Sequence, residues 1–191
     1  MSTSQFVGLV LAGGQSSRMG TNKSELVFQN KTLLEIACSC LRSTGVNRII
    51  VSGAYSGYVC IQDEWPFSGP AAAILSAAVH SYFVTTAYML VLPVDMPLLA
   101  TTILIRLMNA MENERVEASF IKNNPLPCCI KVAALKKVLN DYLNQPAISM
   151  QKLLTEKLNY KALDCNEVMK KSLTNINTPA AFSKLRMDYE T

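Results

Sequence analysis

The strongest constraint on the fold is a pair of continuous apolar runs at residues 6–11 and 88–92. Their apolar residues do not alternate with polar ones, which is the pattern of a strand buried on both faces of a parallel sheet. Gly13-Gly14 follows the first run closely and Pro93 ends the second, and both are signals that stop a strand. We therefore expect two central strands of a largely buried sheet.

Segments with helical spacing separate the expected strands along the chain. Further strands are predicted at 48–53, 58–61, near 116–121, near 128–132 and near 160–163. Helices are predicted at 32–41, 71–79, 101–111, about 133–143, about 149–157 and from Pro179 onward. This alternation predicts an α/β fold, a three-layer α/β/α sandwich with a mostly parallel, Rossmann-like sheet. Since the chain has 191 residues and no internal repeat, we expect residues 1–191 to form a single domain.

Composition argues against several classes of function. The net charge of +4 comes from scattered Lys and Arg residues, whereas a nucleic-acid-binding protein usually shows a basic stripe, so no nucleic-acid partner is expected. The six cysteines include no C-x-x-C pair, which argues against a zinc site or a thioredoxin-like motif. The single histidine, His80, has no obvious catalytic partner in the sequence, so a Ser-His or Cys-His enzyme is not expected.

Two features bear on location. The N-terminus lacks a basic n-region, and its apolar run is short for a signal peptide, so we expect a cytoplasmic protein. Between Trp65 and Ile105, Asp95 is the single charged residue, but prolines and threonines interrupt the apolar runs before any reaches the ~18 residues of a membrane span. We interpret this stretch as protein core and expect no association with a membrane.

A glycine-rich segment follows the first expected strand. Residues 11–23 read Leu-Ala-Gly-Gly-Gln-Ser-Ser-Arg-Met-Gly-Thr-Asn-Lys. Ligands of open α/β sheets bind at the carboxyl ends of strands, and small residues there let backbone N–H groups approach phosphate oxygens. Arg18 and Lys23 add two cations that suit a triphosphate. The segment matches neither the P-loop nor the G-x-G-x-x-G fingerprint, and two adjacent glycines alone are also compatible with a plain turn.

The second apolar run leads into Pro93-Val94-Asp95-Met96-Pro97. A carboxylate at the end of a buried strand is unfavourable unless it is paired, hydrogen-bonded or bound to a metal ion. The flanking prolines stiffen the backbone, as a metal ligand requires. The alternative is that Asp95 caps a turn or the helix that follows Pro97.

Four motifs together resemble those of the MobA-like nucleotidyltransferases, the family that includes the molybdenum cofactor guanylyltransferases. Residues 11–23 resemble the family signature, and residues 93–97 resemble its metal-binding motif. Gly69-Pro70-Ala71-Ala72-Ala73 resembles the family's G-P-L-A-G turn, and Asn175-Ile176-Asn177-Thr178-Pro179 closely resembles its N-x-N-T-P motif. The motifs occur in the family's order, so the resemblance covers nearly the whole chain.

The resemblance implies a Mg²⁺-dependent transfer of GMP from GTP to molybdopterin, or to another phosphorylated small molecule, with release of pyrophosphate. It implies catalytic roles for Arg18, Lys23 and Asp95, with Asp95 as the ligand of Mg²⁺. The nucleotide would contact Leu11, Ala12, Gly13, Gly14, Lys23, Ser52, Asp63 and Asp95. The acceptor would contact Gly69, Ala73, Asn175 and Asn177. We expect a monomer or a weak oligomer.

Three departures from the family pattern leave alternatives open. Ala73 stands where the G-P-L-A-G turn ends in glycine, Ser52 replaces an asparagine that contacts the nucleotide, and residues 148–151 lack an arginine offered to the acceptor. One alternative is a related nucleotidyltransferase that uses CTP or another phosphorylated acceptor. Another is a nucleotide-binding protein without turnover.

Overall fold

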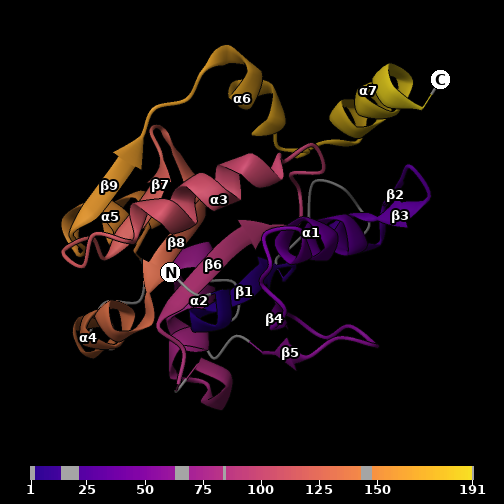
Figure 1. Ribbon diagram of the computed structural model, residues 1–191. Coiled ribbons are helices and arrows are strands. Elements are labelled where there is room, and N and C mark those ends of the chain that lie inside the picture. The colour runs from indigo at the N-terminus through magenta and orange to yellow at the C-terminus, as the bar shows by residue number, and fades with distance from the viewer. Residues whose placement is uncertain (1–2, 14–21, 63–68, 84, 143–147, 191) are drawn as a thin grey trace.

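The computed structural model describes residues 3–13, 22–62, 69–83, 85–142 and 148–190 (Figure 1). Seven strands form its main sheet, in the order β5-β4-β1-β6-β8-β7-β9. They are β1 (Phe6–Leu11), β4 (Ile49–Ser52), β5 (Cys60–Ile61), β6 (Tyr88–Pro93), β7 (Ala118–Ile121), β8 (Asn124–Lys131) and β9 (Tyr160–Leu163). The predicted central strands, β1 and β6, are neighbours in the middle of this order.

The sheet is parallel apart from one strand. The strands β5, β4, β1 and β6 pair in parallel with one another, while β8 is antiparallel to both of its neighbours. The last strand, β9, returns to the common direction by pairing in parallel with β7. The prediction of a mostly parallel sheet is therefore confirmed.

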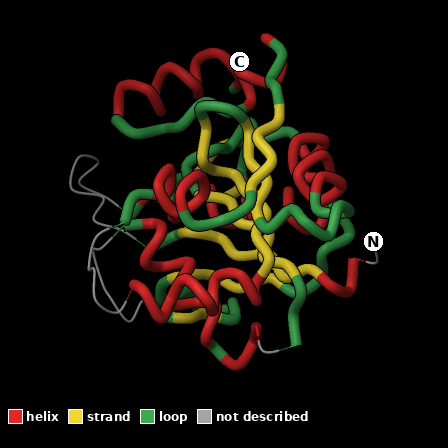
Figure 2. Tube along the Cα trace, turned by 90° about the vertical axis from the view of Figure 1, so that its left-hand side faces the viewer, coloured by secondary structure: helices red, strands yellow, loops and turns green. Residues whose placement is uncertain are grey.

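Helices cover both faces of the sheet, as Figure 2 shows for the strands between two sets of helices. One apolar cluster joins α1 (Leu33–Arg42) and α3 (Thr101–Ala110) to one face. A second cluster joins α2 (Pro70–Val79), α4 (Val132–Tyr142) and α5 (Met150–Glu156) to the opposite face. The predicted three-layer α/β/α sandwich is confirmed.

The central strands explain why their sequences are continuously apolar. In β1, Phe6 and Val10 belong to the first cluster, whereas Val7 and Leu9 belong to the second, because successive side chains of a strand point to opposite faces. All six residues of β1 are buried. A strand with helices on both sides has no solvent face on which a polar residue would be favoured.

Two short strands and one short α-helix were not predicted. A hairpin of β2 (Val27–Phe28) and β3 (Lys31–Thr32) precedes α1, and α6 (Glu167–Ser172) precedes α7 (Pro179–Tyr189). The strands of the hairpin have two residues each and α6 has six, so none is long enough to show a hydrophobic period. The hairpin and α7 lie against each other, with the ring centroids of Phe28 and Tyr189 6.3 Å apart.

The structure also corrects the start of one strand. We predicted a strand near 128–132, but β8 begins at Asn124 and contains Pro125 and Pro127. Proline lacks the N–H group that a central strand must donate. The pairing of β8 with β6 runs from Cys128 to Lys131, so both prolines lie before the part of the strand that pairs with β6. On the side of β7, they lie between the paired residues Asn124 and Cys128, where the register shifts. None of the helices in the described ranges combines the length and apolar character needed to cross a bilayer.

Candidate active site

The carboxyl ends of three parallel strands meet at one edge of the sheet. In the register of the sheet, Leu11 at the end of β1 lies opposite both Ser52 at the end of β4 and Pro93 at the end of β6. A cleft of about 710 Å³ opens at this level. The segments after the three strands therefore enter one cleft, as expected for an open α/β sheet.

The N-terminus of α2 lines the same cleft. Gly69 is the N-cap residue of α2, and its φ of +88° lies in a region that favours glycine. Pro70 occupies the first helical turn, where its missing N–H leaves no hydrogen bond unmade. Ala73 is 5% exposed, and its methyl group belongs to the wall of the cleft.

A further part of the wall comes from the start of β8, which was not predicted from the sequence to belong to the site. Because β8 runs against β6, its N-terminal end lies beside the carboxyl end of β6. Asn124, Pro125 and Leu126 line the cleft there. The signal that could have found them is the one used for Asp95: prolines on both sides of Leu126, in a stretch without charge between Lys122 and Lys131.

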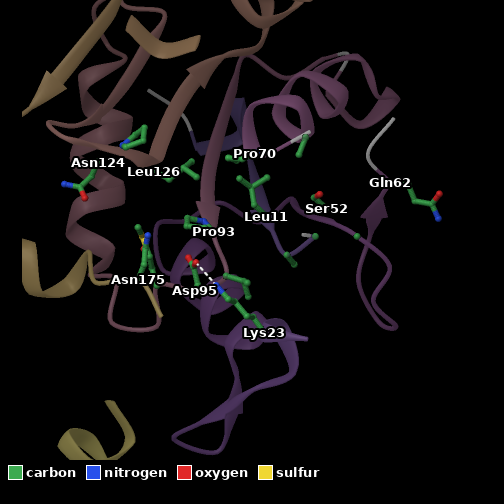
Figure 3. A pocket seen from close by; sticks show the side chains of 18 of the residues that line it. Leu11, Lys23, Ser52, Gln62, Pro70, Pro93, Asp95, Asn124, Leu126 and Asn175 are labelled. Carbon is green, nitrogen blue, oxygen red and sulfur yellow. Dashed lines mark hydrogen bonds and ion pairs between the residues drawn. The ribbon is translucent and has the colours of Figure 1, made fainter. Parts of the chain in front are cut away.

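Lys23 contacts both predicted polar motifs. It opens the short 3-10 helix η2 (Lys23–Glu25), whose N-cap residue Asn22 accepts a hydrogen bond from the backbone N–H of Ser24. The Lys23 Nζ atom lies 3.5 Å from Asp95 Oδ2 and 3.0 Å from Asn177 Oδ1. Figure 3 shows the lysine and the aspartate facing each other at the mouth of the cleft.

Asp95 is a partly buried acid, and only one of its two carboxylate oxygens has a partner among the described residues. Its Oδ1 atom is buried and has no hydrogen-bond partner among the described residues. Burial raises the pKa of this carboxyl group above its ordinary value of 3.8, and the charge of Lys23 and its hydrogen bond act in the opposite direction. The capping alternative is wrong for α3, since the N-cap residue of that helix is Ala100.

The donor set around Asp95 fits a hard divalent cation. An orphaned carboxylate oxygen at the edge of an open cleft is a ligand that Mg²⁺ accepts. The described residues contain no group of three or more His, Cys, Asp or Glu side chains that could hold a metal ion by themselves. Magnesium commonly takes one or two carboxylates and completes its coordination with water and substrate phosphates.

The C-terminal motif is fixed to the segment that carries Asp95. The backbone N–H of Ile176 donates to the carbonyl of Asp95 at 2.8 Å, and the Ile176 side chain is buried. The two asparagines on either side of it therefore have different surroundings. Asn175 lines the cleft, whereas Asn177 contacts Lys23 and is not a lining residue.

Most of the predicted site residues gather at this cleft. The lining residues include nine of them: Leu11, Ala12, Gly13, Lys23, Ser52, Gly69, Ala73, Asp95 and Asn175. Three predicted residues, Gly14, Arg18 and Asp63, lie outside the described residues. Gly53, Ala54 and Gln62, which follow β4 and β5, also line the cleft and were not predicted from the sequence.

The residues set aside from catalysis lie elsewhere. The His80 ring stacks on Tyr82 with centroids 4.9 Å apart and does not line the cleft. All six cysteines are free thiols. Residues 148–151, which lack the family's arginine, also do not line the cleft.

Comparisons with known proteins point to one family. The model of the MobA-like NTP transferase domain matches residues 8–159. The molybdenum cofactor guanylyltransferase of Xanthomonas euvesicatoria is 32% identical over 185 residues, which cover 94% of both chains. A second molybdenum cofactor guanylyltransferase, from Polynucleobacter asymbioticus, is 30% identical, again over 94% of both chains.

Solved structures share the fold at lower identity. The molybdopterin-guanine dinucleotide biosynthesis protein A of Archaeoglobus fulgidus superposes with a TM-score of 0.76 and is 21% identical, over 96% of this chain and 98% of that chain. A 2-C-methyl-D-erythritol 4-phosphate cytidylyltransferase from Thermus thermophilus reaches 0.66 at 13% identity, over 96% and 98% of the two chains. The arrangement of strands and helices alone therefore does not distinguish between bases or acceptors.

Proposed function

Because this chain belongs to the family of MobA-like NTP transferases and is a nucleotidyltransferase, we propose that it transfers GMP from GTP to molybdopterin and releases pyrophosphate. The observation that supports this most directly is the meeting of Lys23, Asp95 and Asn177 at the edge of one cleft. These residues come from three motifs far apart in the sequence. Two relatives named molybdenum cofactor guanylyltransferase, which match over 94% of the chain, support the choice of GTP and of molybdopterin.

The cleft has two ends, to which we assign the two substrates. Figure 3 shows Ser52 and Gln62 at one end and Asn124, Leu126 and Asn175 at the other, with Lys23 and Asp95 between them. We assign the guanine and ribose to the first end and the acceptor to the second. The transferred phosphate would then lie over Leu11 to Gly13, where Lys23 and Asp95 face each other.

To catalyse this reaction, the protein mainly has to position the reacting groups and to neutralise their charge. Phosphoryl-type transfer needs little covalent help, and in-line positioning of acceptor and leaving group accounts for much of the rate enhancement. Lys23 holds an ammonium group that stabilises the negative charge of the α-phosphate and of the departing pyrophosphate. Arg18 is proposed to assist it. Asp95 would hold Mg²⁺, which when bound supplies further positive charge to the phosphates.

A panel of nucleotides tests this proposal. Thermal unfolding is measured with GTP, CTP, ATP or UTP, each with Mg²⁺, because a ligand at ~100 times its Kd adds ~2.7 kcal/mol of stability. We expect the largest rise in Tm with GTP. Pyrophosphate release is then measured with GTP and molybdopterin, first with Mg²⁺ and then with excess EDTA.

The possible outcomes distinguish the alternatives. A larger shift with CTP would replace the guanylyltransferase proposal by that of a related cytidylyltransferase. Binding of GTP without pyrophosphate release would indicate a nucleotide-binding protein that lacks turnover. Unchanged turnover in EDTA would contradict the role of Mg²⁺.

A further inference from the structure

Tyr55 reaches the glycine-rich segment from the turn after β4. Its phenolic oxygen lies 2.9 Å from the carbonyl oxygen of Ala12 and 2.9 Å from the hydroxyl of Ser24. The backbone N–H of Tyr55 donates to the Cys60 thiol, so the turn is tied to β5. Gly53, with a φ of +128°, makes room for the ring, because a Cβ atom there would lie 2.6 Å from Tyr55 Cε2.

The three groups form a chain with one consistent set of donors. A carbonyl oxygen can only accept, and each of the two hydroxyl groups has one proton to donate. The distance from Ser24 Oγ to the Ala12 carbonyl is 3.3 Å, longer than the 2.9 Å from Tyr55. The shortest contacts are therefore made when Ser24 donates to Tyr55 and Tyr55 donates to Ala12. Ser24 is 1% exposed, so the loss of Tyr55 would leave its buried hydroxyl group with only the longer contact to the Ala12 carbonyl.

This chain of hydrogen bonds fixes the peptide group between Ala12 and Gly13, which lines the cleft. In a trans peptide the C=O and the following N–H point in opposite directions. Holding the Ala12 carbonyl toward Tyr55 therefore turns the N–H of Gly13 away from Tyr55. Ala12 and Gly13 line the cleft, whereas Tyr55 does not.

The same chain of hydrogen bonds also fixes the backbone of Lys23, the residue that carries the ammonium group. Ser24 follows Lys23 directly in η2, and its backbone N–H is bound to Asn22 Oδ1 at 3.2 Å. The Tyr55 hydroxyl also lies 3.4 Å from this Asn22 oxygen. Both ends of the glycine-rich segment are thus tied to one phenol group. The backbone of Lys23 is held at the distance from which its Nζ atom reaches Asp95 and Asn177.

We propose that Tyr55 and Ser24 are positioning residues for the nucleotide. Through the carbonyl of Ala12 they orient the Gly13 N–H, and through η2 they place Lys23, without touching the triphosphate themselves. The inference depends on the proposed function, since it assumes that a nucleoside triphosphate binds at this cleft. Its recognition elements are a backbone N–H and an ammonium group, both of which suit phosphate oxygens.

The first test removes one oxygen atom. In Tyr55→Phe the ring over Gly53 is kept and the hydroxyl is lost. We expect the Kd for GTP with Mg²⁺, measured by calorimetry well below the Tm, to rise about tenfold, the equivalent of about 1.4 kcal/mol. The KM for the acceptor should stay unchanged, because these hydrogen bonds do not hold the acceptor end of the cleft.

Tyr58→Phe is the matched control. Tyr58 lies in the same turn and is partly buried, and its hydroxyl group makes no hydrogen bond with any of the described residues. We expect wild-type affinity for GTP. If Tyr58→Phe weakens GTP binding as much as Tyr55→Phe does, the effect belongs to the turn in general and the inference is overturned.

A second variant tests the order of donors. Ser24→Ala should raise the Kd for GTP about threefold, which is less than the effect of Tyr55→Phe, because Tyr55 can still donate to the Ala12 carbonyl. The double variant should bind no more weakly than Tyr55→Phe alone, because both changes act through the same carbonyl. If the two substitutions raised the Kd for GTP by factors that multiply in the double variant, Tyr55 and Ser24 would act independently. That result would contradict a single chain of hydrogen bonds.

The controls separate the failure of this inference from that of the proposed function. If the wild-type protein binds none of the four nucleoside triphosphates, the proposed function fails and the inference fails with it. If the wild type binds GTP and Tyr55→Phe binds it equally well, the inference alone is overturned. A lower Tm of the ligand-free variant at an unchanged Kd would likewise overturn it, because that result describes a residue that only stabilises the fold.

Discussion

At the scale of single residues, Lys23 is the point where separate parts of the chain meet. Its ammonium group contacts a carboxylate from the segment after β6 and an amide oxygen from the segment before α7. The resemblance in sequence predicted roles for all three residues, but it assigned Asn177 to the acceptor alone. The contact with Lys23 could not be predicted, because it depends on where a long flexible side chain lies. Under the proposed function, this contact would place Asn177 beside the nucleotide as well.

Lys23→Ala should weaken GTP binding and leave the fold intact. The side chain contributes charge to the cleft rather than to the apolar core, and a hydrogen bond to a charged group contributes about 1.5–3 kcal/mol. We expect the Kd for GTP to rise by about 10- to 100-fold in calorimetry. Lys137→Ala on α4, which is exposed and outside the cleft, is the control. Equal affinity in wild type and Lys23→Ala would exclude this lysine from phosphate binding.

Asp95→Asn should bind GTP in part but lose Mg²⁺-dependent release of pyrophosphate. The amide keeps the size of the side chain and removes the anionic oxygen that Mg²⁺ prefers. The measurement is pyrophosphate release at saturating GTP and acceptor, with GTP affinity determined in parallel. Full activity of the variant would return Asp95 to a structural role.

Asp95 also predicts a pH dependence of stability in the metal-free protein. Burial raises the pKa of this acid in the folded state, so the folded protein holds its proton at a higher pH than the unfolded chain does. Stability is then lost as the pH rises from the unfolded pKa through the folded pKa. We expect the wild type to lose stability relative to Asp95→Asn over this interval when both are unfolded in EDTA. A constant difference between the two proteins across this interval would contradict the raised pKa.

At the scale of elements, the N-terminus of α2 shows that a sequence can predict where a helix begins without predicting how that helix affects substrate binding. The helix predicted at 71–79 begins one residue earlier, at Pro70 after the N-cap residue Gly69, where glycine and proline have distinct backbone preferences. The extra methyl group of Ala73 lies in the wall of the cleft. By contrast, α6 and the start of β8 were missed, since short elements and prolines give little signal of regular structure.

Ala73→Gly should raise kcat/KM for the acceptor and leave GTP affinity unchanged. Removing a methyl group from the wall gives the acceptor more room, with a gain in transition-state binding of roughly 1–3 kcal/mol. Glycine in the helix costs about 1 kcal/mol of stability, so the Tm should fall. Ala72→Gly is the matched control, because Ala72 is 1% exposed in the same helical turn and does not line the cleft. It should lose stability without a kinetic gain.

Steady-state kinetics with saturating GTP and varied acceptor decide this prediction. A neutral or slower Ala73→Gly would mean that the methyl group does not obstruct the acceptor. A change in GTP affinity instead would place the start of α2 beside the nucleotide.

At the scale of the whole molecule, the sheet consists of a parallel part and a part built around β8. The parallel direction of β4, β1 and β6 agrees with the predicted mostly parallel sheet, which was inferred because continuous apolar runs alternate with helical patterns. The reversal of β8 was not, since the direction of a strand depends on its connection and on its neighbours rather than on its own residues. The seven-stranded sheet, which joins the first strand β1 to the last strand β9, supports our proposal that the chain folds as one domain.

Hydrogen exchange should distinguish the two parts. GTP with Mg²⁺ is expected to slow amide exchange in peptides that contain residues 11–13 and 52–54, because the nucleotide is proposed to lie at the ends of β1 and β4. The acceptor should instead protect peptides that contain Asn124, Leu126 and Asn175. Mass spectrometry of the protein with each ligand in turn provides the measurement. Protection of residues 124–126 by GTP alone would contradict the division of the cleft.

The reversal of β8 has a consequence for how enzymes of this architecture diversify. The hairpin of β7 and β8 turns at the cleft, with Asn123 at a φ of +66° just before the lining residues. Insertions or exchanges in this turn would alter one substrate's surroundings, while the strands that carry the phosphate-binding segments keep their sequence and register. With the acceptor at this end of the cleft, as we propose, selection could change the acceptor by remodelling one connection, and a protein engineer could attempt the same by transplanting that hairpin between homologues.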